Sequence, residues 1–454
     1  MVQSTVTTKV QRTVPDPLRI LMLTPAFPPC IGGGERYAHA LATTLAGRGY
    51  EVTVLTSDIR RQADFWRGCD TQGSPELDDH DASLPVIRCP VSSFPGGSVG
   101  LDLWRKAMIC LSALPGDQSR LLAAMARRVP RISGMAEAID GCDADIIHAF
   151  NLSWEYPLTL AWQAARRKGL PLVVTPFMHP GSVGDRRVIR NHSMDHQRRI
   201  LRDAAAVLAM TDIEREALIA LGVAHERIAV VGGGVPGTFS AVSGASARHL
   251  DPCEIEFPQH IADRLPTDIP FVLLIGRISR DKGALQAVEA VIGLQERGVA
   301  VALVLVGEPS REFERFYRRL TPEQRQIIVP LSLVDEGTKH ALLRRAAMLI
   351  LPSAVESLGI VVLEAWTHGK PVIGARAGGL AEVIDEGRDG LLVEYDDIAG
   401  LADAIAALLG DPALAERLGS AGQRKVKTQF SWDAVTDRVE AAYAAALAAV
   451  LGEG

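Results

Sequence analysis

The chain has 454 residues, a formal net charge of −6 and only 5% aromatic residues. This length suggests two or three domains, and the chain has no basic-aromatic platform, so we do not expect it to bind nucleic acid. Its six cysteines are scattered without a Cys-x2-Cys pair, which argues against disulfides and structural zinc and favours a cytoplasmic location. The chain lacks a run of about 18 apolar residues, so no membrane-spanning helix is expected.

The N-terminal half alternates predicted strands and helices. Residues 1–17 are polar and lack the apolar core of a signal peptide, so we expect a disordered tail. Strand 19–24, the glycines at 32–34 with the helix after them, and strand 51–56 form a strand–helix–strand unit. Glycines at the first turn of such a unit are typical of nucleotide-binding folds. Further strands are predicted at 145–150, 171–175, 205–210 and 227–231.

A stretch at 235–268 that is rich in Pro, Ser, Ala and Asp separates this half from a second alternating unit. Helical periodicity dominates from 397 to 451. Two such units predict an α/β chain with two Rossmann-like, doubly wound domains. The strands of the second unit are predicted at 271–275, 299–306, 327–330, 347–351, 371–375 and 390–393.

Two glutamates of the second unit, Glu356 and Glu364, bracket a run that changes from turn to helix. Gly359 lies where this helix is predicted to begin, and a helix N-terminus offers backbone N–H donors and the positive end of a dipole. A diphosphate would fit there, between two carboxylates suited to the hydroxyl groups of a sugar and a ribose. Taken alone, the pair is also explained by two surface glutamates on an ordinary helix.

A strand-to-helix loop upstream contributes two cations. It reads Gly-Arg-Ile-Ser-Arg-Asp-Lys-Gly and contains Arg277 and Lys282. Cations in a loop bounded by glycines suit a diphosphate held from both sides, although a solvated loop explains this segment taken by itself. The order and spacing of the two segments within one α/β unit favour the diphosphate site.

Together these motifs resemble those of one enzyme family. The Gly-Arg-x4-Lys-Gly loop, followed about seventy residues later by Pro-Ser-x2-Glu-x7-Glu, resembles the donor half of retaining GT-B glycosyltransferases of family 4. The loop from Pro28 to Arg36 is similar to that family's Pro-Pro-x2-Gly-Gly-x-Glu-Arg motif. The resemblance extends from about Arg19 to Tyr443, nearly the whole chain.

The resemblance implies a GT-B fold, in which the two Rossmann-like domains face each other across a cleft. It predicts an acceptor-side domain at 18–240, a linker at 241–268, a nucleotide-sugar-binding domain at 269–430 and a last helix at 431–454 that returns to the first domain. Such an enzyme would move a hexose-type sugar, with retention of configuration, from a UDP or GDP donor to a glycan, lipid-linked or small-molecule acceptor. Because the nucleotide sugar is a co-substrate, no cofactor is expected.

The resemblance also implies roles for individual residues. Arg277, Lys282 and the amides near Gly359 would stabilise the departing diphosphate, so no metal is expected. Glu356 would position the donor sugar, and Glu364 would hold the ribose. The remaining donor contacts are expected from Gly33, Gly34, Val334, Ser357, Leu358 and Ile360.

Two histidines follow neighbouring predicted strands, at the sheet edge where α/β sites gather. His179 is the preferred candidate for the reacting centre and His148 the second, although a lone histidine is usually structural. The family often has His-x-His after the first of these strands, whereas here Phe150 holds the second position. The chain also departs from the family at Ser357, where Gly is commoner, and at Gly233–Gly234, where Asn-Gly is usual.

Two other classes of function remain open. One is a GT-B nucleotide-sugar epimerase, against which the signature of Glu356 and Glu364 argues. The other is a non-catalytic nucleotide-sugar-binding protein, against which the presence of Arg277 and Lys282 argues.

A segment of the first domain carries Trp104, Met108 and Leu111 on one predicted helical face. Core packing is one explanation for this face. The other is an exposed lip for a lipid-linked acceptor, or for peripheral contact with the inner face of a membrane, with Arg105 and Lys106 toward anionic groups. The exposed lip predicts that Trp104→Glu leaves the melting temperature nearly unchanged.

Overall fold

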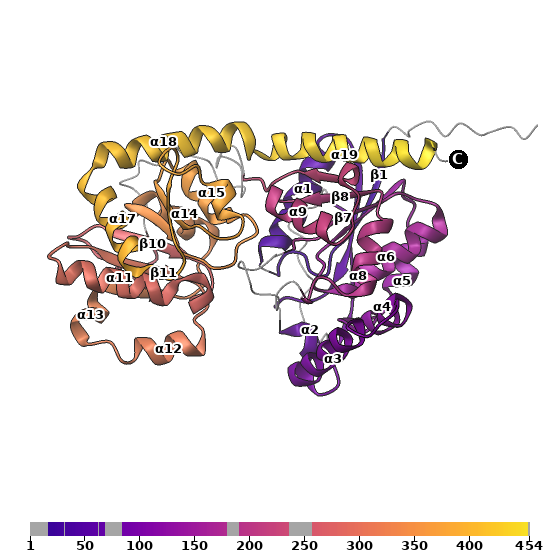
Figure 1. Cartoon of the computed structure of the whole chain (residues 1–454), viewed down its shortest axis with the longest axis horizontal. Coiled ribbons are helices and arrows are strands. Elements are labelled where there is room, and N and C mark those ends of the chain that lie inside the picture. Colours follow the sequence, from indigo (N-terminus) through magenta and orange to yellow (C-terminus); the bar gives the residue numbers. More distant parts are fainter. Residues whose placement is uncertain are drawn as a thin grey trace, which may run out of the picture.

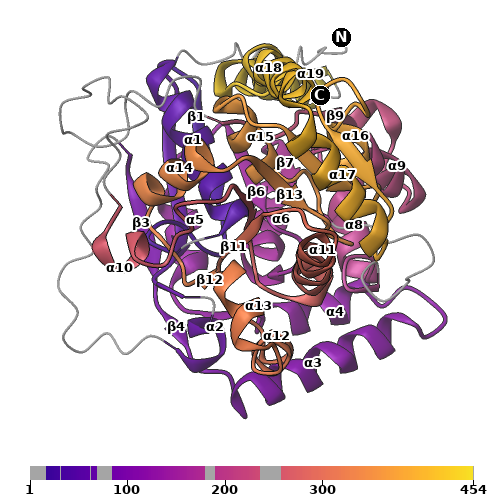
Figure 2. The ribbon, with the colours of Figure 1, turned by 90° about the vertical axis from the view of Figure 1, so that its left-hand side faces the viewer.

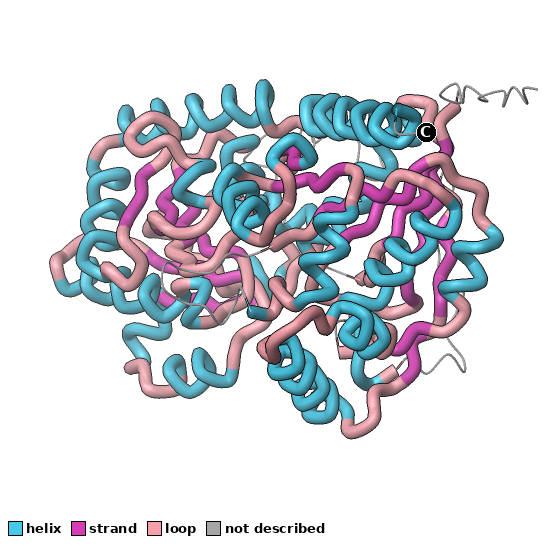
Figure 3. Tube along the Cα trace, turned by 45° about the vertical axis from the view of Figure 1, so that its right-hand side comes forward, coloured by secondary structure: helices cyan, strands magenta, loops and turns pink. Residues whose placement is uncertain are grey.

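The computed structural model describes residues 17–30, 32–61, 63–68, 84–178, 190–235 and 257–452. They form two α/β domains, each with a parallel sheet between layers of helices (Figure 1 and Figure 3). The predicted fold class is therefore confirmed. The apolar runs read from the sequence form the sheets, and the strand β10, Phe271–Ile275, is buried at every position.

The sheet of the first domain has seven strands in the order β3-β2-β1-β6-β7-β8-β9, and all of its pairs are parallel. The sequence did not predict β3, because this short edge strand is only partly apolar and includes Arg88. The order of connection reverses between β1 and β6, and ligands of α/β sheets gather beyond the carboxyl ends of strands at such a point. The strands are β1 Arg19–Leu23, β2 Glu51–Ser57, β3 Val86–Cys89, β6 Ile146–Phe150, β7 Leu172–Thr175, β8 Ala206–Ala209 and β9 Ile228–Val230.

The sheet of the second domain has six parallel strands in the order β12-β11-β10-β13-β14-β15, with its reversal between β10 and β13. Both sheets thus have the doubly wound order of a dinucleotide-binding fold. A separate pair, β4 Val91–Ser92 and β5 Arg131–Ile132, is antiparallel. The strands of the second sheet are β10 Phe271–Ile275, β11 Ala302–Val306, β12 Ile328–Leu331, β13 Met348–Leu351, β14 Val372–Ala375 and β15 Leu391–Val393.

Helices cover both faces of each sheet (Figure 2). Those of the first domain are α1 Gly33–Gly47, α2 Asp64–Arg67, α3 Gly97–Ser112, α4 Ser119–Ala126, α5 Met135–Gly141, α6 Glu155–Lys168, α8 Asp195–Asp203 and α9 Asp212–Ala220. Those of the second part of the chain are α10 Gln259–Ala262, α11 Ala284–Glu296, α12 Arg311–Tyr317, α13 Pro322–Ile327, α14 Glu336–Arg345, α15 Ile360–Thr367, α16 Leu380–Val383, α17 Ile398–Gly410, α18 Pro412–Gln429 and α19 Trp432–Gly452.

The last helix, α19, packs on the first domain, while α18 lies along the second (Figure 1). Arg48 of α1 binds three carboxylates of α19, at 3.2, 2.6 and 2.9 Å. These belong to Asp433, Asp437 and Glu440. The chain thus crosses between the domains twice, before β10 and again between α18 and α19.

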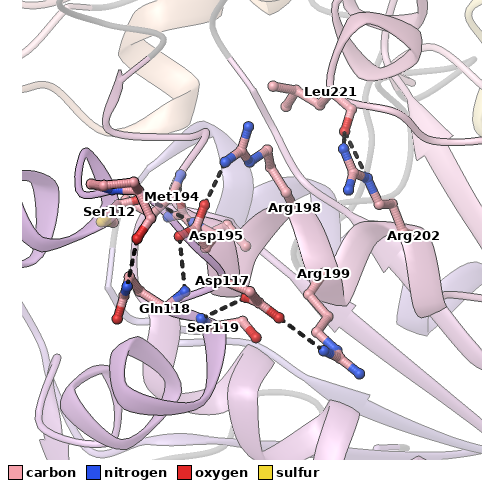
Figure 4. Close-up of polar contacts among 12 residues, drawn as sticks. Ser112, Asp117, Gln118, Ser119, Met194, Asp195, Arg198, Arg199, Arg202 and Leu221 are labelled. Atoms are coloured by element: carbon pink, nitrogen blue, oxygen red, sulfur yellow. Dashed lines mark hydrogen bonds and ion pairs between the residues drawn. The ribbon is translucent and has the colours of Figure 1, made fainter.

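The pair of helices α3 and α4 is attached to α8 by polar contacts (Figure 4). The Ser112 hydroxyl oxygen accepts the backbone N–H of Asp195 at 3.0 Å, and the Asp195 carboxylate accepts the N–H of Gln118 at 3.2 Å. Arg199 pairs with Asp117 at 3.3 Å. These contacts fix the turn between α3 and α4, so α3 has a defined orientation at the edge of the domain.

The face of α3 that carries Trp104, Met108 and Leu111 points inward. Met108 is fully buried, and the Trp104 Nε1–H donates to the Met125 carbonyl at 3.3 Å. The prediction of an exposed lip at Trp104 is therefore wrong, because this face packs on a cluster that also contains Phe94.

Arg105 also points inward, contrary to prediction. Its guanidinium donates to the Ser153 carbonyl and pairs with the buried Glu155 at 3.3 Å. The large apolar side chains that α3 exposes are Val99 and Leu103, at 67% and 62%. The segment is thus an amphipathic helix whose outer face differs from the expected one.

Among the described residues, no single helix is both long and apolar enough to cross a bilayer. The pair α17 and α18 meets that test of length and composition only when taken together, and it bends by 101°.

Candidate functional site

Two loops of the second domain meet beyond the carboxyl ends of β10 and β13. The first loop contains a 3-10 turn at Arg280–Lys282, and the second runs from Pro352 to Gly359. The carbonyl of Asp281 accepts the N–H of Ala354 at 2.9 Å and the hydroxyl of Ser353 at 3.2 Å. The structure therefore brings together the two segments that the sequence singled out.

Lys282 and Glu356 form an ion pair at this junction. The Lys282 ammonium lies 2.6 Å from the Glu356 carboxylate and also donates to the Val355 carbonyl at 3.0 Å. Their side chains are 18% and 16% exposed, so a ligand can reach the pair. An ammonium has three N–H donors. Two of the three are used by these contacts, and the third suits an additional anion.

Arg277, the second predicted cation, is much more exposed. Its side chain is 69% accessible and pairs with Asp281 at 2.8 Å. An exposed ion pair of this kind contributes little to stability. Arg277 can therefore exchange its partner for an incoming anion at small cost.

The helix α15 begins at Ile360, directly after Gly359, as predicted. Gly359 has a φ of 78°, in the left-handed region that favours glycine, and a Cβ here would lie 2.5 Å from Leu380. Ser357 and Leu358 precede it in the same loop, and Leu358 is buried. The first amides of α15 thus form a helix N-terminus beside Lys282, an arrangement that suits a phosphate.

The glycine loop of the first domain faces this helix. A Cβ on Gly33 would lie 3.9 Å from Ile360, and one on Gly34 would lie 3.2 Å from the ring of Phe177. Glycine at position 233, where the family usually has Asn, has a physical reason as well. A Cβ there would lie 2.2 Å from Leu358. At Gly233 a side chain would require Leu358 to move, so glycine suits the close approach of the two domains there.

Glu364, one turn further along α15, is paired with a lysine that sequence reasoning missed. Lys339 of α14 places its ammonium 2.6 Å from Glu364 Oε1 and 2.8 Å from the carboxylate of Glu336. Burial raises the pKa of Glu364, and the Lys339 ammonium opposes that shift. Val334, expected to contact the base, lies just before α14 and is partly buried.

Arg36 of α1 reaches across to the same group of charges. Its guanidinium lies 2.5 Å from Glu336 and 3.9 Å from Glu364. Arg36 follows the glycine loop, so the motif of the first domain and the carboxylates of the second meet at this point.

A cavity of about 630 Å³ opens at these residues, between α1 of the first domain and α14 and α15 of the second. His340 and His368 line it and hydrogen-bond to each other at 3.0 Å. Burial, with nearby cations, lowers the pKa of His340 to about 3 and that of His368 to about 4. Both imidazoles are therefore neutral near pH 7. The other lining residues are Arg36, Tyr37, Ala40, Gly234, Val235, Asp335, Glu336, Gly337, Arg344, Ile360, Glu364 and Trp432.

The structure does not bring His148 to this site. The ring is fully buried, with Nδ1 2.7 Å from the Tyr443 hydroxyl and Nε2 2.8 Å from the Thr175 hydroxyl. Burial lowers its pKa to about 3. His148 thus joins the first sheet to α19. His179, the preferred candidate, lies outside the described residues.

Glu214 of α9 is a third buried glutamate, and within the described part of the chain no cation pairs with it. Its two oxygens accept the backbone N–H groups of Met178 and Met210, at 2.6 and 2.7 Å. Burial raises its pKa to about 7. Glu214 thereby anchors the end of the segment that leads to His179.

Among the described residues, no group of three or more His, Cys, Asp or Glu side chains is arranged to hold a metal ion. At the junction of the two loops lie two cations, each paired with a carboxylate, and a helix N-terminus. That catalysis needs no metal stays a prediction.

Comparisons with known proteins identify the family and the fold. The model of the glycosyl transferase 4-like domain matches residues 32–234, and that of glycosyl transferases group 1 matches residues 258–425. A D-inositol 3-phosphate glycosyltransferase of Xylanimonas cellulosilytica is 30% identical over 88% of this chain and 89% of its own. A glycogen synthase of Mycobacterium tuberculosis is 27% identical, over 94% and 95%.

A solved structure of similar fold is sucrose-phosphate synthase from Thermosynechococcus elongatus. It has a TM-score of 0.69 and 21% identity, covering 95% of this chain and all of that one. The two doubly wound domains and the likeness to this solved structure place the chain in the GT-B fold class. This chain belongs to the glycosyltransferases of family 4.

Proposed function

We propose that this protein transfers a hexose from a nucleoside-diphosphate sugar to an acceptor with retention of the anomeric configuration. The observation that carries the proposal is the Lys282–Glu356 pair beside the N-terminus of α15. This arrangement offers a cation, backbone amides and a carboxylate within one accessible junction. A diphosphate bound there would place its sugar next to Glu356.

The chemistry follows from these charges. The bond between the sugar C1 and the phosphate oxygen breaks, and its electron pair goes to the diphosphate. Lys282, Arg277 and the amides of α15 would stabilise the charge that develops on that leaving group. The acceptor oxygen then bonds to C1 from the same face. Its proton passes to a phosphate oxygen of the leaving diphosphate.

The nucleoside half of the donor would enter the cavity beside α14. Glu364 lines that cavity and would accept a hydrogen bond from the ribose. Val334 would offer its backbone to the edge of the base. Backbone contacts alone do not select the base, so we propose either a UDP or a GDP donor.

A thermal-shift panel of nucleoside diphosphates and nucleotide sugars tests the donor assignment, because a ligand that binds only the folded state raises the melting temperature. We expect one diphosphate and its sugar to stabilise the protein. If none does, the donor site is wrong.

Proton NMR then tests the reaction. Retention predicts a transferred sugar with the same anomeric configuration as the donor. Donor that is altered in the absence of any acceptor would instead indicate an epimerase, and donor that binds without turnover would indicate a binding protein.

For the acceptor, we propose an apolar or lipid-linked molecule that approaches the outer face of α3 at the inner surface of a membrane. Val99 and Leu103 are exposed on α3, as is Lys106, and Leu114 is exposed in the turn that follows the helix. The apolar side chains would enter the interface while Lys106 meets anionic groups.

Two variants of α3 test the acceptor proposal. Leu103→Glu should leave the melting temperature unchanged and reduce binding to vesicles that contain anionic lipid. The matched variant Trp104→Glu should instead unfold the protein at a lower temperature, since Trp104 is packed. Equal vesicle binding by wild type and Leu103→Glu would remove α3 from the proposal.

We propose a cytoplasmic location and a reaction without metal. The first is supported by three described cysteines, Cys89, Cys110 and Cys142, whose thiols are not joined in disulfides. The second is supported by the cations at the junction, which would do the work of a metal. Loss of activity in a strong chelator, restored by magnesium or manganese, would disprove the second.

A further inference from the structure

Lys339 is a buried lysine whose charge faces the proposed ribose site. Its side chain is 6% exposed and that of Glu364 is 9% exposed. Burying two charges is expensive unless they are paired with good geometry. The distance of 2.6 Å and the second contact, to Glu336 at 2.8 Å, provide that pairing.

The two oxygens of Glu364 have different surroundings. Oε1 lies 2.6 Å from Lys339 and 3.9 Å from Arg36, so both cations approach the same oxygen. Oε2 is buried and has no hydrogen-bond partner among the described residues. A buried carboxylate oxygen without a partner is costly. Because Glu364 lines the cavity, a ligand there can supply the missing donor.

We propose that Lys339 is a positioning residue for donor binding, which holds Glu364 by Oε1 so that Oε2 accepts one hydroxyl of the donor ribose. This inference rests on the proposed function. Without Lys339 the carboxylate would be free to rotate or to take up a proton. In either case its second oxygen would no longer be a fixed acceptor.

The contacts of Glu364 predict how much each ribose hydroxyl contributes to affinity. With Oε1 already occupied, Glu364 offers one strong acceptor rather than two. Removing a single hydroxyl, at either the 2′ or the 3′ position, should therefore cost as much affinity as removing the carboxylate. Removing the other hydroxyl should cost much less.

Calorimetry with UDP, 2′-deoxy-UDP and 3′-deoxy-UDP tests this claim. If the protein binds GDP, the same experiment uses GDP, 2′-deoxy-GDP and 3′-deoxy-GDP. We expect Lys339→Met to weaken binding of the ribonucleotide roughly tenfold to a hundredfold, the effect of one lost hydrogen bond to a charged group. For the deoxynucleotide that lacks the engaged hydroxyl, Lys339→Met should change affinity by less than about twofold. Lys370→Met, a partly buried lysine that does not line the cavity, serves as the matched control and should bind as the wild type does.

The double variant with Glu364→Gln separates positioning from general damage. If Lys339 acts through Glu364, then adding Lys339→Met to Glu364→Gln should cause no further loss. Should Lys339→Met not fold, Glu364→Gln alone must lose the discrimination between ribose and deoxyribose, and Lys339→Arg must keep it.

Equal losses for the ribonucleotide and all deoxynucleotides, or additive losses in the double variant, would overturn the positioning role. The proposed function fails separately, if the wild type binds no nucleoside diphosphate at all.

Discussion

Two lysine–glutamate pairs stand in the second domain, with the same nitrogen–oxygen distance of 2.6 Å and different surroundings. Lys282 and Glu356 lie in loops, with side chains 18% and 16% exposed. Lys339 and Glu364 lie on two packed helices, with side chains 6% and 9% exposed.

The difference in burial suits the two ion pairs to different roles. Water can solvate Lys282 and Glu356 when they part, so these residues can change partners when a donor binds. Lys339 and Glu364 cannot part without leaving Glu364 buried with only the more distant Arg36 as a partner, at 3.9 Å, which is unfavourable. The first pair therefore suits chemistry, and the second suits a fixed position.

Glu356→Gln should produce the largest effect, on turnover. The amide keeps the size of the side chain and removes its charge, so we expect kcat to fall by about a hundredfold to a thousandfold. Affinity for the nucleoside diphosphate should remain close to that of the wild type, because the proposed contact of Glu356 is with the sugar. Steady-state kinetics and calorimetry check both points, and unchanged kcat would remove Glu356 from the site.

Lys339→Met and Lys282→Met compare the two pairs in stability. Removing Lys339 leaves Glu364 buried without its nearest cation, so the free energy of unfolding should fall by about 2–4 kcal/mol near pH 7. Lys282→Met should cost less than about 1 kcal/mol. Denaturant unfolding measures both changes. Equal losses would mean that burial does not distinguish the pairs.

The same comparison has a pH dependence. In Lys339→Met the pKa of Glu364 should rise further above its unfolded value, because burial is no longer opposed by the ammonium. A raised folded pKa gives stability that is present at low pH and lost as pH rises through that pKa. The deficit of the variant relative to the wild type should therefore shrink as pH falls toward about 4.5.

Glu214 extends the comparison to a buried glutamate whose carboxylate accepts two backbone N–H groups. Its pKa is about 7 in the folded protein against 4.5 as the reference. The wild type should therefore lose about 2–3 kcal/mol of stability as pH rises from 4.5 to 7. Glu214→Gln does not titrate and should lack this contribution. Unfolding curves at several pH values measure the slope, and equal slopes would contradict the assignment.

Removing either of the two cations at the junction should weaken donor binding, by modestly different amounts. Lys282→Ala removes a half-buried charge and should weaken binding of the nucleoside diphosphate by roughly 1.5–3 kcal/mol. Arg277→Ala removes an exposed one and should cost about 1 kcal/mol. If calorimetry shows that both variants bind as the wild type does, the diphosphate lies elsewhere.

Much of the donor side could be predicted from sequence because its signals are local. The apolar run before Gly276 predicts a strand, and the residues after Pro352 predict a turn followed by a helix. Both elements lead to loops at one sheet edge, which places Lys282 near Glu356.

Lys339 could not be predicted in this way. It lies among polar residues of α14, where a lysine is ordinarily solvated, and only the packing of α14 on α15 buries it. His148 shows the same limit, since its strand was predicted but its hydrogen bond to Tyr443 depends on the distant α19. A helical periodicity also does not say which side faces the core, and Trp104 is the case in point.

The two crossings between the domains lie side by side. Val235 forms a parallel bridge with Ser431, and its N–H donates to the Phe430 carbonyl at 2.9 Å. Two adjacent, hydrogen-bonded strands bend together easily but cannot slide past each other without breaking that bond. If the domains move relative to each other, we therefore expect them to pivot near Val235 and Ser431. Such a rotation would displace α3 and α12 the most, because they lie on the opposite side of the molecule from α18 and α19 (Figure 1).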